Sequence, residues 1–289
     1  CRKHTAGVSV ILKGGVYFMI FIKRKTMRLA AAFLAAICLL LSGCTGADAP
    51  EKPTEKETLT IGSDIYSPYF YLDDNGDFAG IDVEIAEEAC RRLGVTPEFK
   101  QISWQNKDAC LKSGTVDCLW GSFSMNGRED DYSWAGPYMY SRQVVVVKAA
   151  SDIRTLKDLN GKNIAVQDAT KPDELFSDDA ISGVSVKKVY SFATMTDVFA
   201  ALKKEYVDAC AGHETACLDH IRNISGEYRV LDEALFSADL GVAFDRETGA
   251  KRAGQLTAVL TEMKNDGTIR KILEKYSLDI DFALKGNEK

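Results

Sequence analysis

Two segments of the chain match each other without a gap, and this repeat constrains the fold more than any other feature. Residues 110–121 read CLKSGTVDCLWG, and residues 201–212 read ALKKEYVDACAG. Each combines a helical stretch ending near Leu-Lys, then Val-Asp, then an apolar strand that ends in Gly. The repeat predicts two lobes of similar topology, with GSFS of one facing GHET of the other. Chance likeness between units of similar composition is the alternative, and the matched positions favour duplication.

Short apolar strands alternate with helical stretches along the rest of the chain. Strands are expected at 59–62, 98–102, 116–120, 141–148, 163–167, 184–190, 207–211, 228–231 and 240–244, and helices at 81–93, 107–113, 195–204, 214–222, 255–263 and 269–276. Such alternation predicts an α/β fold with mainly parallel sheets. We expect residues 59–146 and 240–289 to form one lobe and residues 147–239 the other, with two strands crossing between them.

The N-terminal region has the pattern of an export signal. Basic residues at 23–28 precede an apolar run at 29–41, which is too short to span a bilayer comfortably. Residues 41–44, LSGC, resemble the lipobox of bacterial lipoproteins, which implies a lipid on Cys44; a plain signal peptide ending near a cysteine is the alternative. Residues 1–43 are therefore expected to comprise upstream sequence, with a true start at Met19 or Met27, and the signal.

The segment after the signal is polar and bears prolines. Residues 44–58 have no apolar periodicity, which predicts a flexible tether between lipid and folded body. We therefore expect an exported, monomeric protein held on the extracellular or periplasmic face of the cell membrane. The net charge of −6, with no basic stripe beyond the N-terminus, argues against nucleic acid as a partner.

Five cysteines remain once the signal and Cys44 are set aside. They form an odd set without CxxC or histidine spacing, which predicts buried free thiols and no metal site: Cys90, Cys110, Cys118, Cys210 and Cys217. One disulfide remains open in an exported protein. No cofactor is expected.

The first copy of the repeat runs into a candidate ligand loop. We expect the strand at 116–120 to be followed by a turn-rich loop at 121–127, at the edge of the sheet where α/β folds bind ligands. Gly121 permits close backbone approach, Ser122 and Ser124 donate and accept hydrogen bonds, and Arg128 offers a planar fork that matches a carboxylate. An ordinary surface loop with a solvated arginine is the alternative.

Several motifs, taken together in their order, resemble the type 3 extracellular solute-binding proteins (solute-binding protein family 3) over residues 59–278. They are IGSDIYSPYF, NGDFAGIDVEIA, LKSGTVDCLWGSFS, WAGPY, DLNGKNIAVQ and LTEMKNDGTIRKILEKY. The resemblance implies a two-lobed, type II periplasmic-binding-protein-like fold, with two mainly parallel sheets and two crossing strands. It also implies capture of a polar amino acid in the cleft for an ATP-binding cassette (ABC) importer.

The resemblance also implies roles for individual residues of the first lobe. Asp64 and Tyr66 lie where the family contacts the ligand's amine and side chain, and Trp104 matches an aromatic wall. Arg128 matches the arginine that binds the ligand carboxylate. Ser122 and Ser124 match loop positions that hold the amino-acid head group.

In the second lobe, the resemblance places backbone donors at the start of a helix. Ala169 and Thr170 match those donors, with Thr170 as the expected cap, and Lys171 adds a positive charge that would favour an extra carboxylate on the ligand.

The chain departs from the family pattern at two places. The loop between Ser124 and Arg128 is one residue shorter than usual. Where the family carries an aspartate for the ligand ammonium, this chain has His213, followed by Glu214. Either Glu214 binds the ammonium, or His213 recognises another group, or the ligand is not a standard α-amino acid; a histidine satisfied by backbone is the remaining alternative.

The main hypothesis is a lipid-anchored binding protein whose closed, ligand-bound state is recognised by a permease. The first rival is an enzyme on the same fold, resembling periplasmic cyclohexadienyl dehydratases, with His213 and Glu214 in acid–base roles. The second rival is a lipoprotein that senses a ligand and reports to a membrane partner.

Overall fold

The computed structural model describes residues 57–286 of the 289-residue chain. The export signal, Cys44 and residues 45–56 of the expected tether lie outside the described residues, so those assignments stay predictions. Within residues 57–286, no helix combines the length and the apolar character needed to cross a bilayer.

The first half of the fold is a parallel sheet covered by helices. Strand β1 (Thr58–Ser63) pairs in parallel with β4 (Thr96–Gln101) and β5 (Cys118–Ser124). The remaining elements here are the hairpin β2 (Tyr71–Leu72) and β3 (Phe78–Ala79), α2 (Ile81–Leu93), η1 (Trp104–Asn106), α3 (Lys107–Lys112), and the C-terminal α7 (Ala250–Asn265), α8 (Thr268–Leu273) and α9 (Ile280–Lys285). Helix α9 was not predicted.

The second half repeats this arrangement. Strand β7 (Asn163–Gln167) pairs in parallel with β8 (Lys188–Phe192) and β9 (Ala209–His213). Its other elements are η2 (Leu156–Leu159), α4 (Lys171–Ser177), α5 (Met195–Lys203), α6 (Glu214–Asn223) and β10 (Tyr228–Val230).

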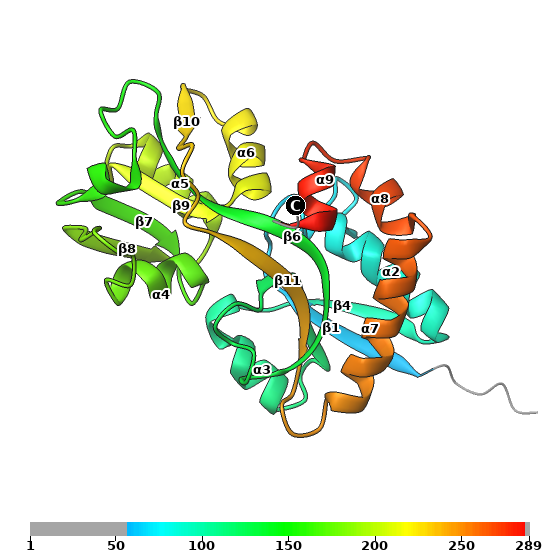
Figure 1. Cartoon of the computed structure of the whole chain (residues 1–289). Coiled ribbons are helices and arrows are strands. Elements are labelled where there is room, and N and C mark those ends of the chain that lie inside the picture. The colour runs from blue at the N-terminus through cyan, green and yellow to red at the C-terminus, as the bar shows by residue number, and fades with distance from the viewer. Residues whose placement is uncertain (1–56, 287–289) are drawn as a thin grey trace, which may run out of the picture. The chain divides into compact units, whose positions relative to one another are not determined.

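Two long antiparallel strands connect the halves, as Figure 1 shows. Strand β6 (Ser133–Lys148) pairs with β11 (Phe236–Phe244) and with β9, and β11 also pairs with β5. The two-lobed α/β fold with crossing strands is thereby confirmed, although the ladder runs without a break as β4-β1-β5-β11-β6-β9-β7-β8, with β10 on β6. The predicted lobe limits, after residues 146 and 239, fall inside β6 and β11 and stay a prediction.

The run of four valines at 144–147 reflects burial on both faces of β6. Val144 and Val146 pack into one hydrophobic cluster, and Val145 and Val147 into another. Alternate side chains of a strand point to opposite faces, so an unbroken apolar run is what a strand covered on both sides requires.

Several predicted boundaries were wrong, and two of them differ because of strand pairing with β11. Strand β5 continues through Ser124, so the expected loop at 121–127 is strand over its first four residues. Leu240 and Gly241 pair with Ser124 and Phe123, which extends β5 beyond its contact with β1. Strand β6 likewise begins at Ser133 rather than at residue 141, again opposite β11.

The two copies of the sequence repeat use equivalent aspartates in the same way. The Asp117 carboxylate accepts a hydrogen bond from the backbone N–H of Thr60 at 2.7 Å, and the Asp208 carboxylate accepts one from Asn163 N–H at 2.7 Å. Their own N–H groups donate to the carbonyls of the same two residues. Each aspartate therefore fixes the start of its strand against the neighbouring parallel strand, which supports the duplication.

The glycine that ends each repeat lies at a point of close approach. A Cβ on Gly121 would lie 2.0 Å from Ser63 Oγ, and one on Gly212 would lie 2.8 Å from Met195 Cε. A side chain at position 121 would displace Ser63, whereas one at position 212 would meet the flexible end of Met195, so the steric requirement for glycine is stricter in the first copy.

The five cysteines of the described chain are free, as predicted. Cys90, Cys118, Cys210 and Cys217 are buried, and Cys110 is partly buried. Burial raises the pKa of the Cys90 thiol to about 11, which makes it a poor nucleophile.

Thiol counting tests this arrangement. A recombinant fragment of residues 57–289, denatured in guanidinium without reductant, is expected to react with five equivalents of a thiol reagent. Three equivalents would show that one disulfide forms and would contradict the assignment.

Candidate functional site

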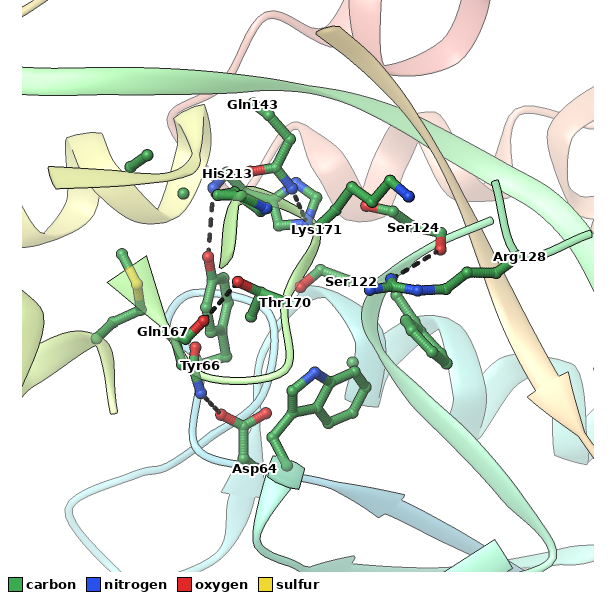
Figure 2. A pocket seen from close by; sticks show the side chains of 17 residues that line it. Asp64, Tyr66, Ser122, Ser124, Arg128, Gln143, Gln167, Thr170, Lys171 and His213 are labelled. Carbon is green, nitrogen blue, oxygen red and sulfur yellow. Dashed lines mark hydrogen bonds between the residues drawn. The ribbon is translucent and has the colours of Figure 1, made fainter. Parts of the chain in front are cut away.

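One cavity collects most of the predicted site residues. It is shown in Figure 2. Its lining comprises Asp64, Tyr66, Trp104, Gly121, Ser122, Phe123, Ser124, Arg128, Gln143, Gln167, Thr170, Lys171, Pro172, Met195, Ala211, Gly212 and His213. Strands β5 and β9 contribute their carboxyl ends, so the two copies of the repeat meet here.

Two predicted residues do not line the cavity. The Glu214 carboxylate accepts a hydrogen bond from Arg142 Nε at 2.8 Å instead. Ala169 has φ +58 and packs against the cluster around Trp104, and its N–H donates to Asp173 at 3.0 Å. Thr170 is the N-cap of α4 by position, but its hydroxyl donates to the Gln167 carbonyl at 2.6 Å rather than capping the helix.

Arg128 brings a buried positive charge to the cavity. Its side chain is 7% exposed, and Nη2 donates to the carboxylate of Glu174 on α4. The guanidinium carbon lies 5.2 Å from the centre of the Phe123 ring. The arginine thus has one anionic partner and an aromatic support, and it lines the cavity beside Ser122 and Ser124 (Figure 2).

Asp64 lies at another part of the lining, between the two halves. Its Oδ2 accepts a hydrogen bond from Gln167 Nε2 at 2.6 Å. Burial raises the pKa of Asp64 to about 6, so the carboxylate is ionised at neutral pH.

Tyr66 makes a second polar contact between the halves. Its hydroxyl accepts a hydrogen bond from the backbone N–H of His213 at 3.3 Å. With the Asp64–Gln167 pair, this contact draws the ends of β1, β7 and β9 together around the cavity.

His213 is uncharged at neutral pH. The side chain is buried, and burial lowers its pKa to about 3. Gln143 Nε2 lies 2.8 Å from His213 Nε2; because an amide nitrogen only donates, the imidazole accepts there and we infer a proton on Nδ1.

Three buried polar atoms of the lining have no protein partner. They are Gln143 Oε1, Gln167 Oε1 and His213 Nδ1. Neither glutamine was predicted from sequence. The signal was weak: Gln143 is a polar residue before four valines, and Gln167 is a polar residue at the end of an apolar strand. Unpaired groups of this kind are costly unless a ligand satisfies them.

Comparison with known proteins identifies the chain. The model of the bacterial extracellular solute-binding proteins, family 3, matches residues 59–279. The protein belongs to this family. Family members bind amino-acid ligands and work with ABC transporters.

Relatives of this solute-binding protein include the L-cystine-binding protein of Bacillus subtilis (strain 168), which is 29% identical over 77% of this chain and 82% of the relative. The histidine-binding periplasmic protein of Escherichia coli (strain K12) is 25% identical over 80% of this chain and 90% of its own length. Among solved structures, that of Tv2483 bound to L-arginine is 29% identical, with a TM-score of 0.70 over 77% of this chain and 91% of that chain.

No group of three or more histidine, cysteine, aspartate or glutamate side chains in residues 57–286 of the solute-binding protein could hold a metal ion.

A buried aspartate on α2 of the solute-binding protein holds Ser122 in place. Ser122 has φ +44, a conformation that residues other than glycine rarely adopt. Its N–H donates to Asp82 Oδ2 at 2.6 Å, and Tyr138 donates to Asp82 Oδ1 at 2.8 Å. Asp82 is 1% exposed, and burial raises its pKa to about 7.

Asp82 therefore gives a prediction for pH dependence. Its folded pKa of about 7 lies above the ordinary 3.8, so the stability it contributes is complete at low pH and is lost as the pH rises through 7. Asp82→Asn removes this titration. Relative to the wild type, the variant's free energy of unfolding should rise by about 4 kcal/mol between pH 4 and pH 7.5. Urea denaturation at a series of pH values checks this. If the free energies of unfolding of variant and wild type changed equally with pH, the prediction would be refuted.

Proposed function

We propose that this solute-binding protein captures a polar amino acid or a close relative, with the ligand carboxylate bound by Arg128. The observation that carries the proposal is a nearly buried guanidinium lining a cavity beside two serines. Its Nη2 donates to Glu174 and its Nη1 to the Ser124 carbonyl at 3.5 Å, which leaves other N–H donors of the guanidinium for a ligand. A charge-assisted, desolvated pair with a carboxylate is the strongest anchor that this lining offers.

Other atoms of the lining suit a donor or a cation on the same ligand. Asp64 is ionised above about pH 6, and the unpaired oxygens of Gln143 and Gln167 accept hydrogen bonds. Trp104 and Tyr66 add aromatic surface that favours a cation. Relatives named for binding L-cystine, histidine and L-arginine support an amino-acid ligand of this dipolar kind.

The protein's place in transport follows from the family and from the N-terminal sequence. We infer that the lipobox-like residues 41–44 anchor it through Cys44, and that an ABC permease in the same membrane recognises its closed form. Polar contacts between the halves, Asp64–Gln167 and Tyr66–His213, support a closed form that a ligand would stabilise further.

The dehydratase alternative is not favoured. We infer a binding protein rather than an enzyme, since the curated relatives that it matches are named as binding proteins. A histidine with a pKa of about 3 is also a weak base at neutral pH, and Glu214 lies outside the cavity lining.

Arg128→Ala tests the carboxylate contact. Isothermal titration against a panel of the standard amino acids should show binding to the wild type that weakens at least about 100-fold in the variant, because one partner of a buried charge pair is lost. Arg142→Ala is the matched control, since Arg142 pairs with Glu214 and does not line the cavity. Equal affinity of Arg128→Ala and wild type would refute the proposal.

Asp64 predicts how binding depends on pH. The affinity for the amino acid that binds most tightly in the panel should fall about tenfold between pH 7.5 and pH 5, because only about a tenth of Asp64 stays ionised one unit below its pKa. Asp64→Asn should bind more weakly at pH 7.5 and lose this dependence. Titrations at both pH values check it; the same pH dependence in the variant would assign the effect to another group.

A further inference from the structure

We propose that Glu174 sets the net charge around Arg128 and thereby makes the cavity select monocarboxylate ligands over dicarboxylate ones. This inference rests on the proposed function, in which Arg128 binds a ligand carboxylate. It concerns a residue that neither the sequence motifs nor the family resemblance assigned to the site.

Glu174 is shared by the two cations of the lining. Its Oε1 accepts from Arg128 Nη2, and its Oε2 accepts from Lys171 Nζ at 2.9 Å. Arg128 and Lys171 both line the cavity, whereas Glu174 does not and is 40% exposed. The carboxylate therefore contacts both cations from outside the lining.

Glu174 keeps its charge at neutral pH. Desolvation alone would raise its pKa, but hydrogen bonds from Lys171 and Arg128 lower it below the ordinary value. Arg128, Lys171 and Glu174 together carry a single net positive charge, while the ionised Asp64 lies at another part of the lining. That balance matches one carboxylate and leaves a second one without compensation.

Lys171 lies at a close approach between the halves. A Cβ on Gly127 would lie 2.9 Å from Lys171 Nζ, so the ammonium group lies against the backbone that leads to Arg128. If Glu174 were uncharged, this ammonium would lack its anionic partner and would become available to a second ligand carboxylate. The predicted preference for an extra carboxylate at Lys171 is thus offset by Glu174.

A third cation, Lys107, lies close to Arg128, since both are near the Phe123 ring. Lys107 is buried, but it is absent from the cavity lining, and its Nζ donates to the Ala169 carbonyl at 3.2 Å. Its charge interacts favourably with Asp108, Glu174 and Asp168 and unfavourably with Arg128, so loss of the Glu174 charge would leave Lys107 less compensated as well.

Glu174→Gln tests the inference on the mature protein. Isothermal titration with two nearly isosteric pairs, L-glutamine with L-glutamate and L-asparagine with L-aspartate, isolates the effect of one added carboxylate. The variant should gain about tenfold in affinity for the acidic member of each pair relative to its amide. This size is expected when the repulsion between Glu174 and a second ligand carboxylate, partly screened by solvent, is removed. Asp178→Asn is the matched control: it removes the same charge at the C-cap of α4, where the side chain is exposed.

The outcomes separate this inference from the proposed function. New binding of L-glutamate or L-aspartate by Glu174→Gln, where the wild type shows none, also supports it. No gain for either acid, in a variant with wild-type thermal stability, or an equal gain in Asp178→Asn, overturns it. If Arg128→Ala weakens amino-acid binding while Glu174→Gln shows no gain, only the charge inference fails; if Arg128→Ala binds as the wild type does, the proposed function fails.

Discussion

Burying the Arg128 guanidinium is the constraint on which the rest of the site depends. A charge that is 7% exposed is costly unless its surroundings replace the lost water. Here Glu174 supplies a counter-charge and Phe123 an aromatic face, and the backbone on either side is held by strand pairing and by the hydrogen bond from Trp134 to the Arg128 carbonyl. These contacts hold the guanidinium in place, and we propose that the donors that remain bind the ligand carboxylate.

The duplicated unit explains why the polar groups meet at one place. Asp117 and Asp208 fix the starts of β5 and β9 in the same way, and a glycine near the carboxyl end of each strand permits close approach. The residue after each glycine, Ser122 in one copy and His213 in the other, lines the cavity. The copies then diverge: Ser122 is held at φ +44 by Asp82, whereas His213 is a neutral imidazole bonded to Gln143. The two copies have similar backbones, but they bring different side chains to the cavity.

The sequence predicted features that depend on local pattern. Strand β7 and helix α2 were predicted with their observed bounds, because apolar periodicity and turn residues define both. The ends of β5 and β6 were missed because their extra residues pair with β11, which is distant in sequence. Four residues in or around the site were not predicted for the same reason, because each acts through a tertiary contact: Asp82, Gln143, Gln167 and Glu174. Glu214 was expected in the cleft because it follows His213 in the sequence. It lies in the first turn of α6, and its carboxylate contacts Arg142 instead.

The most direct test of the central claim is a crystal structure of the protein with the ligand that native mass spectrometry identifies. The ligand carboxylate should lie about 2.7–2.9 Å from the Arg128 guanidinium, with Glu174 still on Nη2. A ligand bound in the same cavity without a carboxylate on Arg128 would contradict the account.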